Sequence, residues 1–124
     1  MHGNETILLA EDDPTVRDAF KAILEYGGYV VISAENGREA VLLYRENKVD
    51  LVLMDVFMPV MNGFEAFRRI RESDPDVRIL FTSGFTSDIV DREGINAKDV
   101  RLLQKPVSSD TLLKMVRVTL DAAQ

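Results

Sequence analysis

The sequence predicts an α/β fold, in which a doubly wound, five-stranded parallel sheet carries helices on both faces. Short apolar runs alternate along the chain with longer segments in which apolar residues recur at helical spacing. The run DLVLMD at residues 50–55 has an unbroken apolar interior, which is typical of a central parallel strand covered on both faces. Five such strand–helix units in a row favour right-handed crossovers and the strand order 2-1-3-4-5.

The first unit begins with a strand at 6–10, which ends in three acids before Pro14, a residue suited to the first turn of a helix. We expect this helix to end at Gly27-Gly28. Its apolar residues recur on one side, and its charged residues occupy the other. The expected core side holds Val16, Phe20, Ile23 and Leu24, and the opposite side holds Arg17, Asp18, Lys21 and Glu25.

The second unit pairs a strand at 29–33 with a helix at 38–46, separated by a turn at Asn36-Gly37. Ala40, Val41 and Tyr44 are expected to face the core from this helix.

The third unit joins the strand at 50–55 to a helix that begins near Asn62-Gly63 and ends by Ser73. Phe64 and Phe67 form the expected buried face of that helix. Further strands are expected at 77–82 and 100–104, with at most a short, weak helix within 86–99. The last helix follows Ser108-Ser109-Asp110, which offer N-cap side chains. Its expected apolar face consists of Leu113, Val116 and Leu120.

The composition narrows the class of protein. Apolar residues make up 46% of the chain, enough for one continuous core, so we expect a single domain over residues 1–124. The absence of cysteine excludes disulfide scaffolds and thiolate metal sites. A formal charge of −6 argues against direct nucleic-acid binding. No apolar run reaches membrane-spanning length and the N-terminus lacks a signal-peptide pattern, so a cytoplasmic protein without a membrane partner is expected.

Polar side chains follow the ends of four predicted strands. Glu11 and Asp12 follow the first, Asp55 ends the third, Ser83 follows the fourth and Lys105 follows the fifth. Ligands of open α/β sheets bind outside the carboxyl ends of the strands where the order reverses. We therefore expect these side chains to line one crevice.

Clustered carboxylates repel one another, and a hard divalent cation relieves that repulsion. Mg²⁺ prefers oxygen ligands and is usually held by one or two carboxylates together with phosphate oxygens. Asp55 could act as a carboxylate nucleophile toward a phosphoryl group, with the metal, Lys105 and the Ser83 hydroxyl neutralising charge.

Along almost its whole length the chain resembles the receiver domains of two-component response regulators. The matching stretches are ILLAEDDPTVR at 7–17, DLVLMDVFMPVMNG at 50–63, ILFTSG at 79–84 and LLQKP at 102–106. A lone acidic pair or a lone Lys-Pro would mean little, but four stretches in the right order and spacing are highly specific. The resemblance implies a flavodoxin-like fold.

The resemblance also implies roles for individual residues. Asp55 matches the phosphoacceptor, and Glu11 and Asp12 match the acidic pair that holds Mg²⁺. Phe57 matches the position whose backbone carbonyl reaches the metal. Asp13 matches an acid that is not a primary ligand.

Ser83 matches the hydroxyl residue that contacts the phosphoryl oxygens, and Lys105 matches the lysine that pairs with the phosphoryl group. The peptide bond between Lys105 and Pro106 matches one that is usually cis in such proteins.

The sequence departs from the common pattern of the family in three places. Glu11 stands where Asp is commoner, which predicts a slightly altered metal geometry. Leu102 stands where receivers that signal through a rotating aromatic carry Tyr or Phe. The segment 86–99 lacks the Ala/Gly-rich pattern of transcriptional regulators, and with TSGF and LLQKP it is more similar to receivers attached to hybrid sensor kinases.

The resemblance implies a phosphoacceptor switch rather than a turnover enzyme on external substrates. A histidine kinase or a histidine phosphotransfer protein would donate the phosphoryl group, and a surface within 84–105 would respond. The downstream protein partner is not identified by the sequence, and a phosphorylation-dependent dimer stays open.

Three other functions fit the sequence less well. A phosphohydrolase of the haloacid dehalogenase type carries a second Asp two places after its nucleophile, where this chain has Phe57. A pseudo-receiver usually lacks the acceptor or the acids, and all are present here. A flavin-binding module needs a hydroxyl- and Gly-rich phosphate loop after the first strand, where this chain has EDDP.

Plainer structural interpretations remain for single residues. The three acids at 11–13 could be a solvated turn that favours the helix dipole, and Asp55 could be a strand-end cap. His2 is interpreted as a terminal residue without a role in proton transfer. Packing roles are expected for Met54, Met58 and Met61, and a solvent-facing helix surface for Arg68, Arg69 and Arg71.

Overall fold

The computed structural model describes residues 4–84 and 101–122. Its five strands form one parallel sheet in the order β2-β1-β3-β4-β5, as the sequence predicts. The strands are β1 (Thr6–Ala10), β2 (Val30–Ala34), β3 (Leu51–Asp55), β4 (Ile79–Ser83) and β5 (Arg101–Gln104). The strand order reverses between β1 and β3, so the carboxyl ends of these two strands flank the switch point of the sheet.

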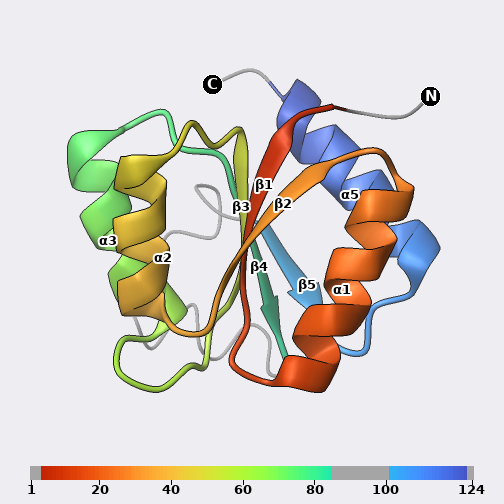
Figure 1. Ribbon diagram of the computed structural model, residues 1–124, viewed down its shortest axis with the longest axis horizontal. Helices are drawn as coiled ribbons and strands as arrows, with labels where there is room; N and C mark the ends of the chain where they lie inside the picture. The colour runs from red at the N-terminus through yellow and green to blue at the C-terminus, as the bar shows by residue number, and fades with distance from the viewer. Residues whose placement is uncertain (1–3, 85–100, 123–124) are drawn as a thin grey trace.

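Helices cover both faces of the sheet (Figure 1). Helices α2 (Gly37–Glu46) and α3 (Gly63–Ser73) lie on one face, and α1 (Pro14–Tyr26) and α5 (Ser109–Asp121) lie on the other. Each helix begins at a side-chain cap that accepts a backbone N–H of the first turn. The caps are Asp13, Asn36, Asn62 and Ser108.

Alternation along the strands divides the core into two layers. Leu8, Val52 and Met54 pack with Phe64 and other side chains under α2 and α3. Ile7, Leu9, Leu51 and Leu53 pack with side chains of α1 and α5. Neighbouring residues of a strand point to opposite faces, and helices cover both faces of β1 and β3, so the interiors of both runs are apolar.

An aromatic cluster anchors α3 to the sheet. The ring of Phe81 on β4 makes T-shaped contacts with Phe64 and Phe67, with ring centroids 4.9 Å and 5.7 Å apart and nearly perpendicular planes. This geometry is favourable for aromatic pairs. The predicted buried face of this helix is therefore confirmed, and α3 is fixed beside the loop that follows Asp55.

Several predicted boundaries differ from the structure by one or two residues. Tyr29 precedes β2 and is buried, and Val77 precedes β4 rather than belonging to it. On α5 the fully buried leucine is Leu112, whereas the predicted Leu113 is partly buried at the flank of the same cluster. Val116 and Leu120 are buried as predicted, and Leu112 and Thr119 complete the buried face of this helix.

The side chains interpreted as packing residues take that role. Met54 is fully buried, and Met58 and Met61 pack against the α2/α3 layer of the core. On α3, Arg68 and Arg69 pair with Glu65, and Arg71 lies over the ring of Phe67. Leu102 is partly buried against the same layer. The expectations for His2 and for 86–99 fall outside the described residues.

In residues 4–84 and 101–122, none of the helices has the length and apolarity needed to cross a membrane.

Candidate functional site at the carboxyl ends of the strands

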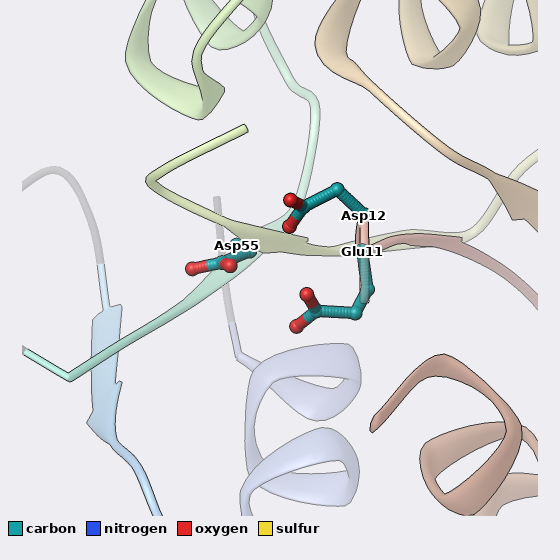
Figure 2. Close-up of side chains that lie close together, drawn as sticks. All are labelled: Glu11, Asp12 and Asp55. Carbon is teal, nitrogen blue, oxygen red and sulfur yellow. The ribbon is translucent and has the colours of Figure 1, made fainter. Parts of the chain in front are cut away.

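Three carboxylates meet at the switch point of the sheet. Glu11 and Asp12 follow β1, and Asp55 is the last residue of β3. One oxygen from each of the three side chains lies within 4.8 Å of the other two. Figure 2 shows the side chains of Glu11 and Asp12 extending from adjacent residues toward the side where Asp55 lies. The convergence predicted from the strand ends is confirmed for these residues.

The three acids differ in their contact with solvent. Glu11 is 1% exposed and Asp55 is 7% exposed, whereas Asp12 is exposed. Burial of two carboxylates this close together is costly unless a cation compensates them. The plain interpretation of Glu11, Asp12 and Asp13 as a solvated acidic turn therefore does not account for Glu11.

Lys105 supplies that cation in this structure. Its Nζ donates to Glu11 Oε1 at 2.6 Å and to Asp55 Oδ2 at 3.1 Å. Lys105 follows β5, and its own backbone N–H donates to the carbonyl of Ser83 at 2.8 Å. The peptide bond between Lys105 and Pro106 is cis, as the resemblance implies. The ammonium thus bridges the strand ends on the two sides of the switch point.

Burial and the lysine act in opposite directions on the carboxyl groups. Desolvation raises the pKa of Asp55, and the charge and hydrogen bond of Lys105 partly offset it. Desolvation likewise raises the pKa of Glu11 against the hydrogen bond from Lys105. For Lys105, burial lowers the pKa, but the two carboxylates outweigh burial and raise it overall. The buried acids are therefore undercompensated by one ammonium, which is the electrostatic situation that favours a divalent cation.

Ser83 and Phe57 lie at the same edge of the sheet. Ser83 ends β4 and is fully buried, directly after Thr82, which is in register with Asp55. Phe57 comes two residues after Asp55, and a hydrogen bond from its backbone lowers the pKa of that carboxyl group. All six residues predicted for the site are thus brought to one edge.

The turn after β1 is shaped by the acids themselves. Glu11 Oε2 accepts the backbone N–H of Asp13 at 3.1 Å, and Asp13 Oδ1 accepts the N–H of Thr15 at 2.9 Å. Asp13 therefore caps α1, which fits its expected exclusion from the primary ligands.

At Gly63, the first residue of α3, the backbone of Asp55 lies so close that no side chain would fit. A Cβ on Gly63 would lie 2.4 Å from the backbone oxygen of Asp55. The N–H of Gly63 also donates to the carbonyl of Val56 at 2.8 Å. Glycine at this position allows the close approach that holds the end of β3 against the start of α3.

Arg17 contacts the site although the sequence placed it on the polar side of α1. Its side chain is only 16% exposed, and Nη1 donates to the carbonyl of Glu11 at 2.8 Å. Helical periodicity assigns a charged residue opposite the core to solvent and takes no account of a backbone turn packed beside the helix. The position of Arg17, one helical turn after the last of the three acids, could have indicated this contact in the sequence.

The site's donor set fits a hard divalent cation. Its ligand atoms are carboxylate oxygens of Glu11, Asp12 and Asp55, and Mg²⁺ favours oxygen donors of this kind. The buried acids with raised pKa values would be stabilised by such an ion.

Comparison with known proteins agrees with the geometry. The family model of the response regulator receiver domain matches residues 7–117. The response regulator receiver protein CpdR of Brucella abortus is 37% identical over 117 residues, which cover 94% of this chain and 98% of CpdR. The sensor kinase CckA of the same organism is 34% identical over 123 residues. These residues cover 98% of this chain but only 13% of the kinase.

Solved structures show the same fold. The chemotaxis protein CheY4 of Vibrio cholerae superposes with a TM-score of 0.86 at 30% identity, covering 94% of this chain and 99% of that one. The response regulator TrrA of Thermotoga maritima, solved in complex with Mg²⁺-BeF, has a TM-score of 0.82 at 28% identity, with coverage of 93% and 98%.

Receiver domains of this type are phosphoacceptor switches of two-component signalling, not turnover enzymes on external substrates, and they bind Mg²⁺ at an acidic pocket. Matching sequence over 7–117, the shared fold and the acidic cluster at the switch point lead to one conclusion: the chain belongs to the response regulator receiver domain family.

Proposed function

We propose that Asp55 is the phosphoacceptor of this receiver domain and that the carboxylates of Glu11, Asp12 and Asp55, with the backbone carbonyl of Phe57, hold the Mg²⁺. The observation that carries this proposal is the buried cluster of carboxylates bridged by Lys105, at 2.6 Å from Glu11 and 3.1 Å from Asp55. Asp55 ends the central strand, at the edge of the sheet where ligands of open α/β folds bind.

In the proposed reaction an oxygen of Asp55 attacks the phosphorus of a phosphohistidine in line with the leaving nitrogen. The new O–P bond forms as the P–N bond breaks, and the electron pair of the P–N bond stays on the leaving nitrogen. The other ring nitrogen of the donor phosphohistidine already carries a proton, so a neutral imidazole is released. Such transfers depend on positioning and charge neutralisation more than on acid–base chemistry. A Mg²⁺ held by Glu11, Asp12 and Asp55 would supply Lewis-acid neutralisation of negative charge on the phosphoryl group.

Lys105 and Ser83 are proposed to complete the neutralisation. Lys105 is tied by its backbone to Ser83, so both approach the acceptor from the β4/β5 side. An ammonium that pairs with Asp55 before transfer can pair with a phosphoryl oxygen afterwards, since phosphorylation places the negative charge on oxygens two bonds beyond the carboxylate oxygen.

A histidine kinase or a histidine phosphotransfer protein is the proposed donor. Similarity to the sensor kinase CckA supports a donor of this kind and an origin in a hybrid kinase as one context for the domain. We place the reaction in the cytoplasm, because ATP is the phosphoryl source for such kinases.

The deciding experiment is intact mass measured after incubation with acetyl phosphate, with and without Mg²⁺. We expect the wild type to gain one phosphoryl mass only with Mg²⁺, and Asp55→Asn to gain none while keeping its fold. Asp50→Asn is the matched control, because Asp50 flanks the opposite end of the same strand and an amide oxygen can still accept the Thr6 N–H. Phosphorylation of Asp55→Asn at the wild-type level would refute the assignment of the acceptor.

Lys105→Ala separates metal binding from the response to the phosphoryl group. Lys105 pairs with the carboxylates of Glu11 and Asp55 but is not a metal ligand, so we expect the variant to bind Mg²⁺. Because the variant lacks the ammonium that neutralises the phosphoryl group, we expect it to accept that group more slowly. Calorimetric titration with Mg²⁺ and the rate of mass gain measure the two properties independently. Unchanged phosphotransfer in this variant would contradict the role given to Lys105.

A further inference from the structure

We propose that Arg17 and the β2–α2 turn, defined as residues Ala34–Gly37, position the two backbone segments that supply the metal ligands. The inference rests on the proposed metal site and adds residues that do not themselves touch the ion. Those segments, Glu11–Asp12 and the β3–α3 loop at 56–62, are separated by more than forty residues in the sequence. The turn contacts both.

The turn holds the first segment through backbone and side-chain bonds. The N–H of Glu11 donates to the carbonyl of Ala34 at 3.1 Å. Arg17 Nη1 donates to the carbonyl of Glu11 at 2.8 Å and lies 3.5 Å from that of Asp12. Its other terminal nitrogen lies 3.8 Å from Glu35 Oε1. The guanidinium therefore links the peptide groups of the acidic pair to the turn.

The turn holds the second segment by direct backbone packing. The N–H of Gly37 donates to the carbonyl of Met61 at 3.0 Å. A Cβ on Gly37 would lie 2.3 Å from that oxygen and 2.9 Å from the carbonyl carbon. The obstructing atoms belong to the main chain, so they can yield only if the β3–α3 loop moves.

The turn has the internal bonds that such a role requires. Asn36 Oδ1 accepts the N–H of Glu39 at 2.8 Å, and Glu39 Oε1 accepts the N–H of Glu35 at 2.9 Å. This reciprocal pair is a form of capping box, which fixes the chain at the start of α2. A fixed turn can transmit the position of one segment to the other.

The charge of Arg17 and its positioning role predict opposite changes in Mg²⁺ affinity. A cation beside the metal site repels Mg²⁺, so if Arg17 acted only through its charge, its removal would tighten Mg²⁺ binding. If Arg17 orients the acidic pair, its removal weakens binding. A lysine has no planar fork with which to reach two carbonyls and a carboxylate, so Arg17→Lys should restore binding only in part.

The experiment is calorimetric titration of the whole chain with MgCl₂. We expect Arg17→Met to raise the Kd about 10-fold, as is usual for groups that orient metal ligands, with Arg17→Lys in between. Gly37→Ala should weaken binding in the same direction. Arg38→Met is the matched control, since it removes one positive charge from exposed residue 38 next to the turn, and it should leave the Kd within about 2-fold.

Two further measurements separate positioning from loss of structure. Urea unfolding without metal shows whether each variant is folded under the conditions of the titration. The Mg²⁺ concentration for half-maximal phosphorylation by acetyl phosphate should rise in Arg17→Met, whereas the rate at saturating Mg²⁺ should change little.

The possible failures differ. Wild-type affinity in folded Arg17→Met, or tighter binding, would overturn the positioning role and leave the metal site standing. Absence of Mg²⁺ binding by the wild type would overturn the proposed metal site and this inference together.

Discussion

Val60 carries a backbone conformation that suits its side chain poorly. It has a φ of 71°, in the left-handed region, and it is 73% exposed in the loop after Asp55. The N–H of Met61 donates to the carbonyl of Pro59 at 2.7 Å, which closes a tight turn around Val60. A β-branched residue in this region is a true outlier and costs about 1–3 kcal/mol.

We therefore expect Val60→Gly to raise the free energy of unfolding by about 0.5–1 kcal/mol, because glycine adopts this φ without strain and little buried surface is lost. Urea denaturation at neutral pH measures the change. Val60→Ala, which keeps a Cβ but removes the branch, should show a smaller gain. A Val60→Gly protein less stable than wild type would mean that the valine side chain makes contacts that outweigh the strain.

Single residues at this site differ in how far sequence could place them. Glu11 and Lys105 follow parallel strands and Asp55 ends one, so the topology alone brings them to one edge. The bridge from Lys105 to Glu11 depends on side-chain reach, which no strand pattern contains. Arg17 was assigned to solvent because helical spacing shows only which side of a helix faces the core. It does not show that the turn containing Glu11 packs against the end of the helix.

The helix starts could be predicted element by element because each cap is local. Ser108 Oγ accepts the N–H of Thr111 at 3.1 Å, and Asn62 Oδ1 accepts that of Glu65 at 2.9 Å. The first residues of the strands were predicted less exactly, since an apolar run can extend beyond the residues that pair with a neighbouring strand. Val77 is apolar but lies before β4, and its N–H bonds to the carbonyl of Asp74 in a local turn.

The cap of α5 offers a test at this scale. Ser108→Ala removes the acceptor for the first turn and should lower the free energy of unfolding by about 1 kcal/mol. Ser109→Ala is the matched control, since Ser109 is also exposed but lies inside the helix, where alanine is favourable. Equal losses in the two variants, measured by urea denaturation, would contradict the capping role of Ser108.

For the whole molecule, sequence reasoning succeeded because the alternation of strands and helices leaves few allowed topologies. The observed order β2-β1-β3-β4-β5 follows from right-handed crossovers around a switch point. Contacts between the two ends of the chain are not predictable in this way. Arg117 on α5 donates to both carboxylate oxygens of Glu5, just before β1, at 3.2 Å and 2.6 Å.

This long-range ion pair predicts a dependence of stability on pH. The hydrogen bond from Arg117 lowers the pKa of Glu5 below its ordinary value of 4.5, because the charged carboxylate is favoured in the folded state. A lowered pKa contributes stability above about pH 4.5 and loses it as the pH falls through the folded-state value. The pair is partly exposed, so the contribution should not exceed about 1 kcal/mol.

We therefore expect Glu5→Gln to be less stable than wild type at pH 6–7, by a difference that shrinks as the pH falls below about 4.5 and the Glu5 carboxylate is protonated, when both are measured by urea denaturation. The difference between the two proteins isolates this pair from the other carboxylates, which titrate in both. Arg117→Met should abolish most of the effect of Glu5→Gln, and high salt should shrink it. A difference that stays constant from pH 7 to pH 3 would show that Glu5 stabilises the fold by packing rather than through its charge.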